Sequence, residues 1–119
     1  MAVLCTILFV EDDAGVRDST VAILSDRGFR MLVARNAEEA LRALETEPVD
    51  ILFTDIVMPG INGIELAKRA KALRPDLKIM FMTAYYSRAR EAAALGRLIF
   101  KPVREAEMVA ELRGLLAAS

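Results

Sequence analysis

TILFVEDD, residues 6–13, places three acidic residues directly after five residues that have the pattern of a buried strand. A short apolar run that polar residues end is typical of a strand covered on both faces. Acids crowded at the end of such a strand cost free energy unless a helix cap, water or a cation compensates their charge. The stretch therefore predicts a parallel sheet and a polar site at one end of its first strand.

The alternation of an apolar run and a helical pattern continues along the chain. Further strands are expected at residues 29–34, 50–54, 78–83 and 97–100. In the first helical segment the residues at helical spacing are Val16, Thr20, Ile23 and Leu24, and Gly28 closes it. Asn36 can cap the second helix, with Glu39 completing a capping box. Five strand–helix units predict an α/β fold with parallel strands. The expected arrangement is a doubly wound (βα)5 fold with a five-stranded parallel sheet in the order 2-1-3-4-5, in which the first and third strands are neighbours.

Composition excludes several classes of function. A chain of 119 residues, 55% of them hydrophobic, is expected to form one domain over 1–119 with a full core. The net charge of −1 gives no basic face for nucleic acid or a membrane surface. The absence of histidine removes histidine-based catalysis. The single cysteine, Cys5, cannot form an internal disulfide, which favours a cytoplasmic protein with Cys5 as a small core residue.

Polar residues follow four of the five expected strands. Glu11 and Asp12 follow the first, Asp55 the third, Thr83 ends the fourth, and Lys101 follows the fifth. In open parallel sheets, ligands bind outside the carboxyl ends of the strands, where the strand order reverses. Three carboxylates brought together there repel one another, and one lysine cannot neutralise them. A hard divalent cation such as Mg²⁺ would, since it prefers oxygen ligands.

Four motifs in this order resemble one family. ILFVEDD, DILFTDIVMPGINGIEL, MTA and FKP are similar to the motifs of the receiver domain of bacterial two-component response regulators, which has a flavodoxin-like fold. The resemblance covers essentially the whole chain. Any one motif alone would be weak, but each of these stands at the end of an expected strand.

The resemblance implies roles for individual residues. Asp55 would accept a phosphoryl group from a sensor histidine kinase or a histidine phosphotransfer protein. Asp12, Asp55 and the backbone carbonyl of Val57 would bind Mg²⁺ directly, and Glu11 would act through a bound water. Thr83 and Lys101 would contact the phosphoryl group.

In this family the peptide bond between Lys101 and Pro102 is typically cis, which is expected to aim Lys101 into the site. Each functional residue also has a plain structural alternative: Asp55 as a turn residue, Asp12 as a helix cap, Thr83 as a helix-entry residue and Lys101 as a solvated surface lysine. Asp13 is expected to cap the first helix rather than to bind metal.

Two features depart from the family pattern. Leu98 occupies the position that usually holds an aromatic residue whose ring moves together with the threonine. The segment from Thr83 to Lys101 is also shorter than usual, so the helix expected at residues 87–95 should be short, irregular or mobile. Tyr85 and Tyr86 are unusually bulky for this loop and would either replace the absent ring or cover the shortened helix.

The expected function is signal transduction by phosphorelay, in which phosphorylation of Asp55 switches a partner-binding surface. The chain would assist its own phosphorylation and dephosphorylation without being a dedicated enzyme. The alternative is a receiver-like module that binds proteins independently of phosphorylation. A third reading, a Mg²⁺-dependent phosphatase, lacks an insertion large enough to form a substrate cap. The sequence leaves open the downstream target, a homodimer, and whether the receiver stands alone or was excised from a longer chain.

Overall fold

A computed structural model of the chain describes residues 5–117 and has the expected α/β architecture. Its strands are β1 (Thr6–Val10), β2 (Arg30–Ala34), β3 (Ile51–Asp55), β4 (Lys78–Thr83) and β5 (Arg97–Phe100). Its helices are α1 (Ala14–Asp26), α2 (Ala37–Thr46), α3 (Gly63–Leu73), α4 (Ala89–Ala93) and α5 (Glu105–Ala117). The five strands pair in parallel in the order β2-β1-β3-β4-β5, which confirms the predicted topology.

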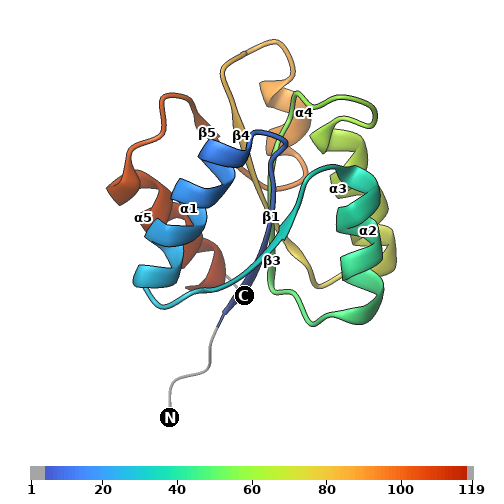
Figure 1. Cartoon of the computed structure of the whole chain (residues 1–119). Coiled ribbons are helices and arrows are strands. Elements are labelled where there is room, and N and C mark those ends of the chain that lie inside the picture. The colour runs from blue at the N-terminus through green and yellow to red at the C-terminus, as the bar shows by residue number, and fades with distance from the viewer. Residues whose placement is uncertain (1–4, 118–119) are drawn as a thin grey trace.

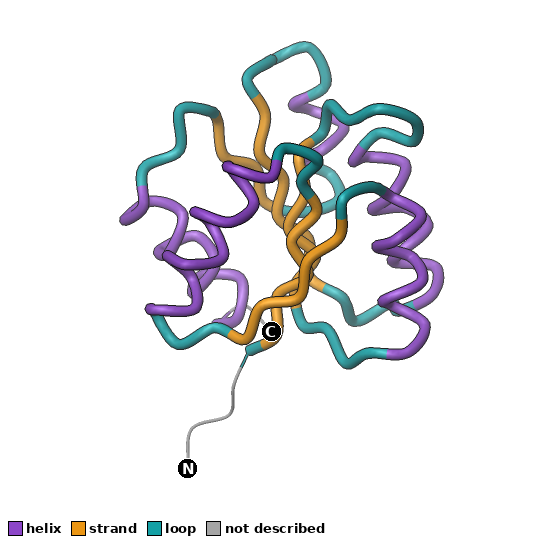
Figure 2. The backbone as a smooth tube through the Cα atoms, viewed as in Figure 1, coloured by secondary structure: helices purple, strands orange, loops and turns teal. Residues whose placement is uncertain are grey.

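Helices cover both faces of the sheet, so the core lies in two layers (Figures 1 and 2). One layer packs the sheet against α1 and α5, and Phe9 and Phe53 meet in it with ring centroids 4.9 Å apart. The other packs the sheet against α2, α3 and the short α4. Every residue of β1 and β3 is buried, because these two strands lie inside the sheet with helices on both sides. This explains why their sequences are continuous apolar runs without alternation.

The helix ends follow the sequence signals with two differences. The Asn36 side chain accepts the Glu39 N–H at 2.9 Å, as expected, but the Glu39 carboxylate accepts the N–H of Arg35 at 2.8 Å, so the capping box closes one residue earlier. In α1 only Leu24 is fully buried, and Val16 remains 42% exposed at the end near the acidic residues. Gly28, with a φ of 91°, allows the turn into β2 that a residue with a Cβ would strain.

The fourth helix is short, as predicted from the sequence. It covers Ala89–Ala93, shorter at both ends than the expected 87–95, and only Ala92 is buried in it. A tight connection through Gly96 leads from it to β5, and a Cβ at Gly96 would overlap the backbone carbonyl oxygen of Ile79 in β4. Within residues 5–117, no helix has both the length and the apolar character to cross a bilayer.

Cys5 lies immediately before β1 and is half buried against the α1–α5 side of the core, not fully inside it. Burial raises the pKa of its thiol to about 11, and the nearby Asp50 carboxylate adds to the shift. The proton is therefore held more tightly in the folded chain than in the unfolded one.

The close approach at Gly96 predicts that Gly96→Ala destabilises the fold by about 2 kcal/mol or more, because the new methyl group displaces backbone. Gly15→Ala is the matched control: an added Cβ there meets only the Asp13 carboxylate, at 3.3 Å, and alanine favours a helix. Urea unfolding of both variants measures the difference. Equal free energies of unfolding for the two variants would contradict the assignment.

The raised thiol pKa predicts slow alkylation of Cys5. At pH 8 the folded chain should react with iodoacetamide about 100-fold more slowly than the chain in urea, since the thiolate fraction falls about 100-fold when the pKa rises from 9.0 to about 11. The rate should rise with pH beyond the range where an ordinary thiol levels off. A native rate equal to that in urea would show that Cys5 is not protected.

Candidate functional site

The candidate site lies at the edge of the sheet where four neighbouring strands end. Glu11 follows β1, Asp55 ends β3, Thr83 ends β4 and Lys101 follows β5. The strands are parallel, so these ends share one edge, and the register places Thr83 opposite Phe100, directly before Lys101. The structure therefore brings together residues that lie up to 90 positions apart in the sequence, from Glu11 to Lys101.

Asp55 is held by contacts on both carboxylate oxygens. Its side chain is 10% exposed, and Oδ2 forms an ion pair with Nζ of Lys101, whose own side chain is 36% exposed. Oδ1 accepts the backbone N–H of Val57 at 3.1 Å. The peptide bond between Lys101 and Pro102 is cis. These contacts hold the carboxylate still, with a cation on one side.

The backbone of Asp55 is fixed as tightly as its side chain. The hydroxyl of Thr54 donates to the Asp55 carbonyl at 2.9 Å. Gly63, the first residue of α3, packs against the same carbonyl so closely that a Cβ would overlap it. The support that Gly63 gives to Asp55 becomes visible only when α3 is packed on the sheet.

Glu11 is a buried acid with an incomplete set of partners. It is 4% exposed; Oε2 accepts the Asp13 N–H at 3.1 Å, whereas buried Oε1 has no hydrogen-bond partner. Burial is the largest cause that raises its pKa, and the acids Asp12 and Asp55 raise it further, while the Asp13 N–H and Lys101 act in the opposite direction. The ionised form of Glu11 is therefore costly unless a cation, or a water bound to a cation, satisfies Oε1.

The two remaining acids of the opening stretch have different environments. Asp13 is the N-cap of α1, and its Oδ1 accepts the N–H of Val16 at 2.9 Å, as predicted. Asp12 is exposed and lies next to the Glu11 carboxyl group. Arg17 on α1 donates from Nη1 to the backbone carbonyl of Glu11 at 3.1 Å and so fastens the acidic turn to the helix. Spacing alone gave no sign of this arginine contact.

Thr83 connects the site to the loop before α4. It is 1% exposed, and its Oγ1 accepts the N–H of Tyr85 at 3.1 Å. Its backbone carbonyl accepts the N–H of Lys101 at 2.8 Å. The hydroxyl proton of Thr83 is not used in the Tyr85 contact, so it can be donated to an acceptor at the site.

Position 98, which usually holds an aromatic residue in the family, is a leucine in this chain. Leu98 is half buried and packs against the core on the α2–α3 side. Phe100, two residues later, stacks with Tyr86 at a centroid distance of 4.4 Å and an interplanar angle of 27°. Tyr86 is nevertheless 75% exposed, and Tyr85 is 60% exposed. Tyr86 therefore covers the end of β5, and its ring comes from the loop before α4.

The residues at this edge fit a hard cation by their chemistry. Among residues 5–117, no three acidic or cysteine side chains form a cage of ligands. The Mg²⁺ ligands expected from the resemblance are fewer: two carboxylates, a backbone carbonyl and a water held by Glu11. The orphaned Oε1 of Glu11 is the observation that favours such a group, because a metal-bound water would satisfy it.

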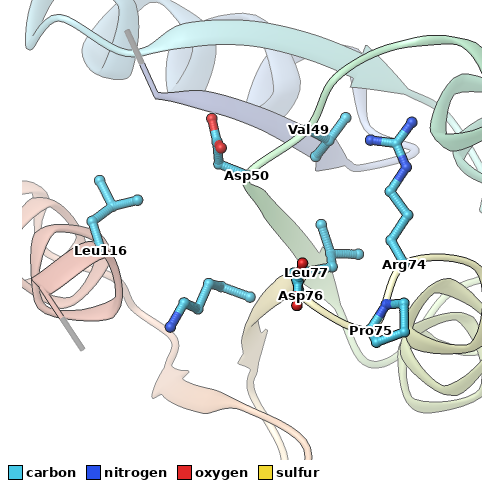
Figure 3. A pocket seen from close by; sticks show the side chains of 8 residues that line it. Val49, Asp50, Arg74, Pro75, Asp76, Leu77 and Leu116 are labelled. Atoms are coloured by element: carbon cyan, nitrogen blue, oxygen red, sulfur yellow. The ribbon is translucent and has the colours of Figure 1, made fainter. Parts of the chain in front are cut away.

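A separate pocket of about 360 Å³ lies at the opposite end of the sheet, before β3 and β4 (Figure 3). Two of its charged side chains support the backbone: Asp50 accepts the N–H of Thr6 at 2.8 Å, and Arg74 donates to the carbonyls of Leu44 and Glu47 at the end of α2. None of the residues expected to act at the phosphorylation site lines it. The candidate site is therefore the edge that carries Asp55.

Comparison with known proteins agrees with this arrangement. The family described as "Response regulator receiver domain" matches residues 7–113. The response regulator receiver protein CpdR of Brucella abortus is 38% identical over 117 residues, which cover 95% of this chain and 98% of that protein. The response regulator MprA of Mycobacterium ulcerans is 32% identical over 114 residues, 92% of this chain, but the chain spans only about half (49%) of MprA.

A solved structure extends the likeness to the fold. The response regulator TrrA of Thermotoga maritima, crystallised with Mg²⁺ and beryllium fluoride, superposes with a TM-score of 0.87 at 29% identity, covering 94% of this chain and 99% of that one. The family match, the full-length likeness to CpdR and the strand order lead to one conclusion. This chain belongs to the response regulator receiver domain family of two-component signalling.

Proposed function

We propose that this chain accepts a phosphoryl group on Asp55 from a histidine kinase or histidine phosphotransfer protein, and that the modification changes its partner-binding surface. The observation that carries the proposal is the position of the Asp55 carboxylate, buried at the end of β3 between the Lys101 ammonium group and the Val57 N–H. A carboxylate that is fixed, shielded and paired with a cation is suited to act as a nucleophile.

The proposed transfer is balanced by ordinary chemistry. A carboxylate oxygen of Asp55 forms a bond to phosphorus while the bond from phosphorus to the donor's imidazole nitrogen breaks, and that nitrogen keeps the electron pair and takes up a proton. Lys101 exchanges part of its pairing with Asp55 for the incoming phosphoryl oxygens. Thr83 supplies a hydroxyl proton to another of these oxygens. Catalysis in such transfers is mostly positioning and charge neutralisation.

Mg²⁺ would be held by Asp12, Asp55 and the carbonyl of Val57, and when bound it would neutralise the oxygens around phosphorus. Glu11 would orient a water on it through Oε1, which has no partner in the protein. The two acids after β1 would then have different roles: Asp12 would contact the cation directly, and Glu11 would act from the buried side through a water.

The response is proposed to pass through Thr83 into the loop before α4. When the Thr83 side chain turns towards a phosphoryl oxygen, the Tyr85 N–H loses its acceptor, and the loop is freed from one of its attachments. The stack of Tyr86 on Phe100 remains to hold it. The population of loop conformations then shifts, and this shift does not require an aromatic ring at position 98.

The alternative function is a receiver-like module that binds its partner without phosphorylation. The packing of Leu98 against the core favours it, since this side chain offers no polar ring edge to a partner. The intact arrangement of Glu11, Asp55, Thr83 and Lys101 argues for the phosphorylated receiver.

The first test uses beryllium fluoride with Mg²⁺, and the readout is tyrosine fluorescence. The chain has no tryptophan, and its two tyrosines both lie in the loop after Thr83, so the signal reports on that loop alone. We expect a saturable, Mg²⁺-dependent change that Asp55→Asn abolishes. Asp13→Asn is the matched control, since asparagine caps a helix as well as aspartate does, and it should respond like the parent. A parent chain that does not respond, or an Asp55→Asn variant that does, would overturn the proposal.

The second test separates the two effects of the Glu11 charge. Glu11→Gln should raise the Mg²⁺ concentration needed for half-saturation by about tenfold, as expected for a group that orients a metal-bound water. In EDTA the same variant should be more stable than the parent by about 1 kcal/mol, because it removes a buried charge beside other acids. Thermal unfolding in EDTA measures the second effect. If the variant binds Mg²⁺ more weakly and is also less stable than the parent in EDTA, Glu11 has only a structural role.

A further inference from the structure

A small hollow lies between the loop after Asp55 and the loop after Thr83. Its volume is about 60 Å³, which is room for about two water molecules. The residues around it are Ile56, Val57, Thr83, Tyr85, Ser87 and Arg88. Thr83 and Arg88 therefore line the same small space. Asp55 is not among its lining residues, but it directly precedes Ile56 and Val57, which are.

Arg88 already forms an ion pair that can be exchanged. Its Nη2 donates to both carboxylate oxygens of Glu91, at 2.8 and 2.6 Å, and its Nε donates to one of them at 3.2 Å. Both side chains remain open to solvent, 44% exposed for Arg88 and 40% for Glu91. Exposed pairs of this kind contribute little to stability, so an anion with more charge can compete for the arginine.

A phosphoryl group is such an anion. It carries about two negative charges and three strong acceptor oxygens, and a guanidinium group matches two of them with its parallel donors. The phosphoryl group, Glu11 and Asp12 together carry about four negative charges. Lys101 and a divalent cation supply three positive charges, so about one unit of negative charge is left over. Arg17, which lies next to the acidic turn, already donates to the Glu11 carbonyl.

We propose that Arg88 exchanges Glu91 for the phosphoryl group on Asp55 and acts beside Lys101 as its second cationic ligand. The proposal rests on the proposed function and adds a residue to it. Arg88 directly precedes α4, so the exchange also pulls the start of that short helix towards the site. This gives the chain a link between phosphorylation and α4 that does not need an aromatic residue at Leu98.

The test compares two variants that break the same ion pair from opposite sides. Beryllium fluoride with saturating Mg²⁺ serves as the probe, and the half-saturating fluoride concentration is read from tyrosine fluorescence of the full chain. Arg88→Gln should raise it by about tenfold, the typical loss for a charge-assisted hydrogen bond. Glu91→Gln should lower it, by up to about fivefold, because Arg88 no longer has a competing partner. Arg88→Lys should lie between Arg88→Gln and the parent, since it keeps the charge and loses the fork.

The control is Arg90→Gln, which removes an exposed arginine two residues away that does not line the hollow. It should bind like the parent, and circular dichroism should show all variants folded. If Arg88→Gln and Glu91→Gln shift the midpoint in the same direction, the ion pair acts only by supporting α4, and the inference fails. Equal midpoints for Arg88→Gln and Arg90→Gln would refute it as well. A parent that does not respond to the probe refutes instead the phosphorylation of Asp55.

Discussion

The ion pair between Lys101 and Asp55 connects two strands that do not touch each other. β3 and β5 lie on either side of β4, and the pair spans the end of β4, whose last residue is Thr83. Lys101 is tied to the same point by its own N–H, which donates to the Thr83 carbonyl. The ion pair thus joins the expected acceptor, the hydroxyl group and the ammonium group into one unit. The geometry of the rest of the site depends on this contact.

The acidic turn after β1 shows how the fold tolerates concentrated charge. Asp12 and Asp13 are exposed, Asp13 also caps a helix, and only Glu11 is buried. Arg17 binds the Glu11 carbonyl and the Asp13 N–H binds its carboxylate, and both contacts favour the buried position in which the pKa of Glu11 is raised. A buried polar oxygen without a partner is uncommon in proteins and marks a place where a further group is expected. The cost in stability is concentrated at the position where a cation would remove it.

The region between β4 and β5 distinguishes this receiver from the usual pattern. The helix is only five residues long, and Gly96 allows the chain to pass directly against β4. With so little helix to pack, the loop is held by the Thr83 hydroxyl and by the stack of Tyr86 on Phe100. Few attachments mean that a small change at Thr83 can alter the whole loop. The short α4 and the exposed ring of Tyr86, stacked on the half-buried Phe100, are where this chain departs from the family pattern.

Hydrophobic periodicity and turn residues are local signals, and they predicted the alternation of strands and helices with polar residues at the strand ends. The short fourth helix was expected from the resemblance to the receiver family, and the strand order from the doubly wound arrangement. The sequence also marked Glu11, Asp55, Thr83 and Lys101 as residues of one edge. Tertiary structure alone decided that Gly63 supports the Asp55 carbonyl, that Arg17 fastens the acidic turn, and that Tyr86 covers Phe100. These contacts join segments whose separation in space depends on how helices and loops pack over the sheet. No local pattern in the sequence specifies that packing, so these contacts could be identified only from the tertiary structure.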